Sequence, residues 1–131
     1  MAILLEIHSI LRWVIVIVGL IATVKFLIGW ISKSEFGRMD RGLSSGFSGM
    51  IDLQVMLGLV YFLVAGLGGA GISSFSIEHT VTMLIAAFVA HAPTISKKRP
   101  LNKFAISFFA VLGALLLIYI GVARLPGGWN R

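Results

Sequence analysis

The chain has 131 residues, of which 58% are hydrophobic and only 12% are charged, and its mean hydropathy is +1.00. Soluble domains are roughly half apolar and a quarter charged, so this composition excludes an ordinary soluble globular protein. The absence of cysteine excludes disulfides, thiolate metal sites and cysteine nucleophiles, and the net charge of +6 comes from basic residues that flank apolar runs, which indicates membrane topology and no nucleic-acid partner.

Four apolar stretches approach the roughly twenty residues that a helix needs to cross a bilayer. They lie at about residues 5–31, 47–67, 77–95 and 104–123. Their length and the lack of a ten-residue alternating pattern favour helices over strands. The sequence therefore predicts an all-α, integral membrane four-helix bundle that forms a single transmembrane domain over residues 1–131. The first stretch lacks the basic start and the cleavage site of a signal peptide, so we expect it to be retained.

The ends of the second and third helices have local signals. The polar segment SEFGRMDRGLSSG precedes the second helix and is expected to be a loop. Ser76 stands two residues before Glu78, which is typical of a helix N-cap followed by an acidic first turn, so the third helix is expected to start at SIEH. Pro93 predicts a stop or a kink near the end of this helix.

The loops predict the orientation. Basic residues occur in the first and third loops, whereas GLGGAGISSFS between them has none. By the positive-inside rule both termini are expected on the non-cytoplasmic side of the membrane. Trp13, Trp30 and Trp129 lie near helix ends, where indoles are expected as interfacial anchors. The loop cations are Lys33, Arg38, Arg41, Lys97, Lys98, Arg99 and Lys103.

Polar residues fall into two layers in this topology. His8 and His79 lie near the outer ends of the first and third helices, and Arg12 lies one turn deeper than His8 on the same face. Near the inner side, Lys25, Asp52 and His91 are expected at depths that allow them to meet inside the bundle. Ionisable residues at such depths are costly and usually find partners. Snorkelling of Lys25, contact of Arg12 with headgroups and interhelical hydrogen bonds of Asp52 are the structural alternatives.

The two outer histidines suit a haem. Haem b in membrane bundles is commonly held by two axial imidazoles from different helices, and His8 with His79 meets this requirement as ligands of the haem iron. Arg12 is then placed to pair with a propionate, because a guanidinium matches a carboxylate in a bidentate manner. His79 and His91 are about 18 Å apart along the helix axis and do not share one haem. We expect no second haem.

Three segments carry a resemblance to a family. They are HSILRWVIVIVGLIATVKFLIGW, DLQVMLGLVYF and IEHTVTMLIAAFVAH, the last followed by a basic loop. Together they resemble the small four-helix bacterial membrane proteins labelled cytochrome b-like, over nearly the whole chain. The resemblance implies a haem-binding electron-transfer protein of the bacterial inner (cytoplasmic) membrane. Relatives are expected to carry a histidine before the Leu-Gln pair where this chain has Asp52, which speaks against haem ligation by the second helix. The most specific matching residues are His8, Ser9, Arg12, Trp13, Leu53, Gln54, Gly58, Glu78 and His79.

Three functions remain open at this point. The first is a b-type cytochrome-like protein that exchanges electrons with a quinone or with a larger redox complex. The second is an accessory subunit of a respiratory or photosynthetic membrane complex that binds no cofactor. The third is a proton or small-solute transporter that uses Lys25, Asp52 and His91. In each case membrane lipid surrounds the protein, and an independent catalytic activity is not expected.

Overall fold

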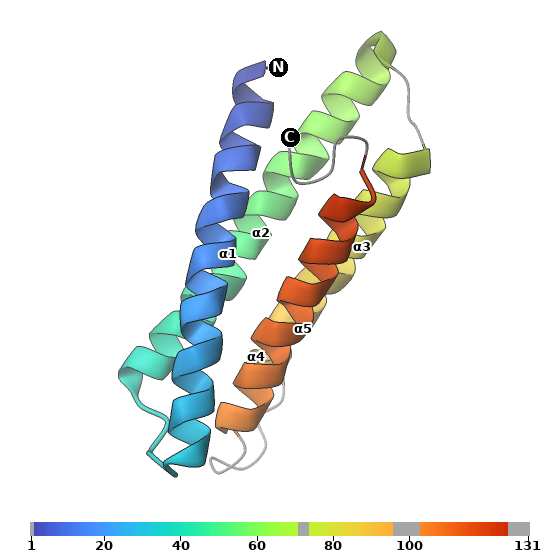
Figure 1. Ribbon diagram of the computed structural model, residues 1–131. Coiled ribbons are helices and arrows are strands. Elements are labelled where there is room, and N and C mark those ends of the chain that lie inside the picture. Colours follow the sequence, from blue (N-terminus) through green and yellow to red (C-terminus); the bar gives the residue numbers. More distant parts are fainter. Residues whose placement is uncertain (1, 71–73, 96–102, 126–131) are drawn as a thin grey trace.

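A computed structural model describes residues 2–70, 74–95 and 103–125, and every element in these ranges is helical. The prediction of an all-α fold is confirmed over this part of the chain. In order, the elements are α1 (Ala2–Ile31), α2 (Arg38–Ala65), the short π-helix η1 (Gly66–Ala70), α3 (Ser74–Ala90), α4 (Ala92–Ile95) and α5 (Lys103–Ala123). They form an elongated bundle in which α1 packs on α2 and α5, and α3 packs on α5 and α2 (Figure 1).

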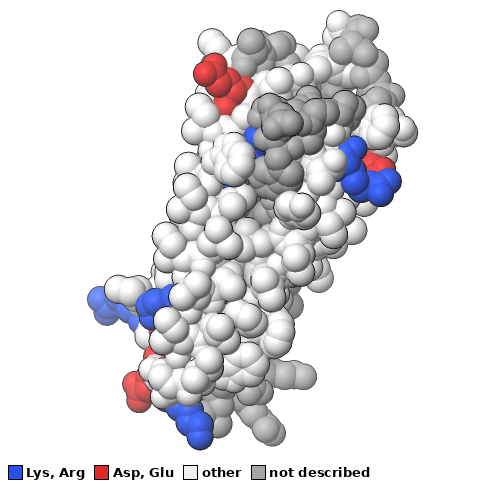
Figure 2. All heavy atoms as spheres, viewed as in Figure 1, with Lys and Arg blue, Asp and Glu red and all other residues white. Residues whose placement is uncertain are grey.

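The lengths of the helices are compatible with a multi-pass membrane protein. Three helical stretches are long and apolar enough to cross a bilayer, namely Ile3–Ile31, Arg38–Gly68 and Lys103–Ala123, whereas Ser74–Ala90 is apolar but shorter. On the face seen in Figure 2 the charged side chains lie in the upper and lower parts of the molecule, and the coloured surface between them carries no Lys, Arg, Asp or Glu. The start of α1 and the end of α5 lie at the same end of the bundle, which we call the outer end (Figure 1).

Helix α2 begins nine residues before its expected start, because Arg38 and not Phe47 is its first residue. The polar segment that looked like a loop contains the capping signal. The backbone N–H of Gly37 donates a hydrogen bond to the Asp40 carboxylate at 2.9 Å, which satisfies a donor that the helix start would otherwise leave unpaired. Gly42, Ser45 and Gly46 of this segment are therefore exposed residues of a helix.

Helix α3 differs from expectation at both ends. It already includes Ser74, so Ser76 is inside the helix and the predicted capping role of Ser76 is wrong. At the other end α3 stops at Ala90, and His91 forms a turn before the single-turn helix α4. Pro93 explains this break, since it lacks a backbone N–H and its ring would clash with the carbonyl of Val89 four residues earlier in a continuous helix.

An aromatic cluster packs the inner half of the bundle, toward the end of α1. The rings of Phe26, Phe36 and Phe104 form one cluster, with centroids 5.0 to 6.5 Å apart. Phe26 is fully buried and Phe104 nearly so. A Cβ added at Gly29 would meet the Phe104 ring under 3.0 Å, so α1 and α5 approach each other closely only because this residue is glycine.

Replacement of Gly29 by alanine is expected to lower the free energy of unfolding by about 1 to 3 kcal/mol, because the added methyl group overpacks a core that is already filled. Gly68→Ala is the matched control, since a Cβ there meets nothing within 4 Å. Denaturant or thermal unfolding of both variants in detergent, followed by circular dichroism, measures the difference. Equal stability of the two variants would contradict the close packing at Gly29.

Candidate functional site

The outer half of the bundle contains a partly open cavity of about 170 Å³ between α1, α2, α3 and α5. Ile15, Ile51, Ala86 and Ile118 line it near the middle of the bundle, and most of its wall is aliphatic. The few polar side chains at the wall include His8, Arg12, Gln54, Tyr61 and His79. An apolar cavity with a small number of convergent polar groups is the usual form of a ligand site.

Helix α2 contacts both the backbone and the ring of His8. The side-chain amide of Gln54 donates a hydrogen bond to the His8 carbonyl oxygen at 2.6 Å. One turn further along α2, a Cβ added at Gly58 would lie 3.1 Å from Cε1 of the His8 ring. The ring thus fits against bare backbone, and any larger residue at Gly58 would push it aside. Gln54 and Gly58 together fix the position of His8 relative to α2.

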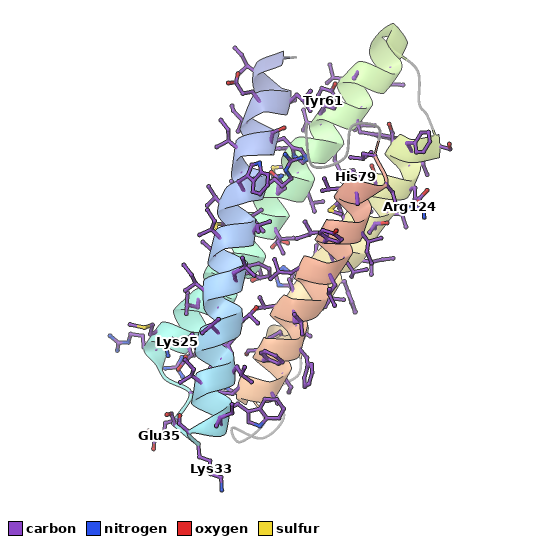
Figure 3. The ribbon with its side chains drawn as sticks, viewed as in Figure 1. Lys25, Lys33, Glu35, Tyr61, His79 and Arg124 are labelled. Atoms are coloured by element: carbon purple, nitrogen blue, oxygen red, sulfur yellow. The ribbon has the colours of Figure 1, made fainter. Side chains whose placement is uncertain are left out.

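His79 is oriented by α5. Its ring Nδ1 lies 3.2 Å from the carbonyl oxygen of Gly121. A carbonyl only accepts hydrogen bonds, so Nδ1 carries the hydrogen, and in the neutral ring the lone pair is on Nε2. Metal-binding histidines usually adopt this arrangement, in which the second nitrogen donates to a carbonyl or a carboxylate. Figure 3 shows His79 and Tyr61 in the outer half of the bundle.

Arg12 brings a positive charge into the same cavity. Arg12 is only 8% exposed, and its guanidinium carbon lies 5.4 Å from the centroid of the Trp13 ring. A guanidinium stays protonated in proteins, so the charge persists in this apolar surrounding. The three residues that the sequence proposed for cofactor binding, His8, Arg12 and His79, therefore line a single cavity.

The inner polar residues form two separate pairs. Nε2 of His91 lies 2.9 and 2.8 Å from the two carboxylate oxygens of Asp52. Lys25 binds Asp40 instead, with Nζ 2.8 Å from Oδ1. The early start of α2 explains this division, because it brings Asp40 level with Lys25 and places Asp52 about 18 Å further along the helix. The expected cluster of Lys25, Asp52 and His91 is thus not assembled.

The sequence pattern does not single out Asp40, because the composition of its segment is typical of a loop. Asp40 is buried and has two roles, since Oδ1 accepts from Lys25 and Oδ2 accepts from the backbone of Gly37. An acidic residue three positions after a glycine that precedes a helix is a recognisable capping signal. Gln54, Gly58 and Gly121 were also not predicted as parts of the site, because interhelical contacts determine their roles.

The donor set suits a haem better than a bare metal ion. Within residues 2–70, 74–95 and 103–125 there is no group of three or more histidine, cysteine, aspartate or glutamate side chains that would hold a metal ion. A haem needs only one or two protein ligands, because the macrocycle supplies the others.

No family model matches the chain, and neither a curated protein nor a solved structure shows detectable similarity to it. The geometry of the site therefore carries the functional argument.

Loss of the Asp40 carboxylate is expected to destabilise the packing of α1 on α2. Asp40→Ala removes both the acceptor for Gly37 and the partner of Lys25, whereas Asp40→Asn keeps a neutral acceptor. We expect the alanine variant to unfold at a free energy about 1 kcal/mol lower than the asparagine variant. Unfolding in a denaturing detergent, followed by circular dichroism, measures this difference, and equal stabilities would rule out the capping role.

Proposed function

We propose that this chain is a small b-type cytochrome-like protein that binds one haem b and transfers electrons in the bacterial inner membrane. Its four main helices cross the bilayer, α3 together with α4, and both termini are on the non-cytoplasmic side. The lengths and apolarity of α1, α2 and α5 support a membrane location. The basic residues of the first and third loops support the orientation.

The observation that carries the proposal is the setting of the two histidines. His8 and His79 come from different helices and line one cavity, and the Gly121 carbonyl orients His79 for ligation through Nε2. Gly58 leaves room for the His8 ring, and Gln54 holds the backbone beside it. Arg12 supplies a cation one turn deeper, suited to a propionate. The residues present fit the chemistry of a haem with two axial imidazoles.

The volume of the cavity sets a condition on binding. At about 170 Å³ it is close to the roughly 150 Å³ cavity that accepts a benzene molecule, so the outer helix ends must move apart to admit a macrocycle. The packing there is loose along α1, α2 and α3, whereas α5 keeps Gly121 and Val122 buried and packs closely on α3. Before Arg12 in α1, after Ile51 in α2 and before Ala86 in α3, no described side chain is fully buried. Regions with few buried contacts open at low cost, so the outer half suits this adjustment.

A bound haem supplies reversible one-electron chemistry, and the protein supplies its orientation and potential. His8 and His79 would hold the iron, while Arg12 would balance propionate charge. The apolar wall of the cavity would keep water from the macrocycle. The electron partner would be a quinone in the bilayer or a larger redox complex.

Removal of either outer histidine is expected to abolish the spectrum of a haem with two axial imidazoles. His8→Ala and His79→Ala each remove one ligand, whereas His91→Ala is the matched control because His91 pairs with Asp52 away from this cavity. Reduced-minus-oxidised absorbance of protein expressed with ample haem is the measurement. A double variant that keeps the wild-type spectrum would refute the ligand assignment. A wild-type protein that stays colourless would instead favour a cofactor-free accessory subunit.

Arg12→Gln is expected to lower the midpoint potential of the haem, because loss of a nearby positive charge stabilises the oxidised, more positively charged form. A change of about 1 kcal/mol corresponds to roughly 40 mV for a one-electron couple. Arg12→Lys keeps the charge and is expected to retain most of the potential. A redox titration followed by absorbance compares the two variants. An unchanged or raised potential in Arg12→Gln would show that the guanidinium does not act on the haem.

A further inference from the structure

Helix α2 leaves most of its apolar half uncovered by the rest of the bundle. In its most apolar 18-residue window only 6% of the residues are buried, compared with 28% and 39% in the corresponding windows of α1 and α5. Its buried side chains, among them Phe47 and Ile51, contact the rest of the bundle. The opposite side is exposed along the whole helix, and we call it the α2 outer face. It comprises Gly42, Ser45, Gly46, Gly49, Leu53, Met56, Val60 and Leu63.

The inner half of the α2 outer face consists of small residues. A Cβ added at Gly42, Gly46 or Gly49 would meet nothing within 4 Å. The exposed side of α1 instead presents large aliphatic residues such as Ile17 and Leu20. Glycines three or four residues apart let two membrane helices approach closely, whereas lipid chains pack as well on larger residues. This half of the face therefore has the composition of a helix contact.

A carboxylate–imidazole pair lies at the edge of the same face. Asp52 lies one helical turn from both Gly49 and Met56, and its carboxylate contacts His91 at the end of α3. The two side chains are 51% and 35% exposed. Asp52 is about 21 Å from the start of α2 and a similar distance from its end, a position that falls within the hydrocarbon core of a spanning helix. Lipid cannot satisfy such a pair, so another protein surface must cover it.

We propose that the α2 outer face binds the same face of a second copy of this chain. Both copies keep one orientation in the membrane, so a two-fold axis along the membrane normal relates them, and the α2 helices cross near Gly46. The small residues are then matched by equally small residues. Each copy also presents a carboxylate and an imidazole together, so the second copy offers an imidazole to Asp52 and a carboxylate to His91. This self-complementarity favours a second copy over a foreign helix, which would have to supply both groups.

The dimer rests on the proposed membrane location and does not depend on haem. Detection of the protein in the membrane fraction, before any cross-linking, tests the location separately. A colourless dimer would support the dimer alone, and a haem-bound monomer would contradict it alone. The cavity with His8 and His79 is lined by the inward sides of the helices, so it stays intact in both states.

Cross-linking in native membranes tests the contact directly, because the chain has no cysteine of its own. Single variants Gly46→Cys and Gly49→Cys are oxidised in membranes, with Val24→Cys, which is exposed on α1, as the control. We expect a product of twice the chain mass for the glycine variants, at least about tenfold more abundant than for the control. Equal yields at all three positions, or a product of another mass that indicates a different protein, would overturn the proposal.

A bulky substitution provides a second readout without oxidation. Gly46→Leu is expected to weaken the dimer at least about tenfold, because the added side chain separates the two α2 helices. Gly68→Leu also adds bulk at an exposed glycine with open space, but away from the crossing point, and is expected to leave the mass unchanged. Light scattering of the purified full chain in mild detergent gives the mass of each variant. A wild-type monomer at all protein concentrations, or an unaltered dimer in Gly46→Leu, would refute the contact.

Discussion

The cluster of Phe26, Phe36 and Phe104 fixes the inner half of the bundle, and the rest of the structure depends on it. It joins α1, the segment before α2 and the start of α5 at one level. Just above it, Phe47 and Ala114 are fully buried and continue the core to the middle of the molecule. Because this half is filled, the helices keep their order although α1, α2 and α3 bury few residues at the outer end, and a cavity can exist there.

Polar contacts connect the helices in pairs. Lys25 with Asp40 and Gln54 with the His8 carbonyl connect α1 to α2. His79 with the Gly121 carbonyl and Glu78 with Arg124 connect α3 to α5. His91 with Asp52 joins α3 to α2. The cavity therefore lies between two hydrogen-bonded helix pairs, and each of the two histidines at its wall belongs to a different pair.

Much of this arrangement follows from the sequence, and what does not has a definite cause. Hydropathy predicts the long helices, and counting depth from the expected helix ends brings His8 and His79 to one level, with Arg12 one turn deeper. The same counting fails for Lys25, because its partner depends on where α2 starts. The carboxylate of Asp40 caps the helix at that start. This short-range signal lies in a segment whose glycine and serine residues are typical of a loop. Contacts such as Gln54 with His8 depend on the rotation of one helix against another, which no single-helix pattern determines.

The firm inner cluster and the loose outer half also give α1 a mechanical property. Phe26 and His8 are separated by about 27 Å along the helix axis. If α1 pivots at the cluster, each degree of rotation displaces His8 by roughly 0.5 Å on that axial length. Changes too small to disturb the aromatic rings would thus alter the span between His8 and His79 by ångströms. A rotation of α1 at the cluster would therefore change the distance between the proposed ligands, and substitutions near Gly29 would reach the cavity without touching it.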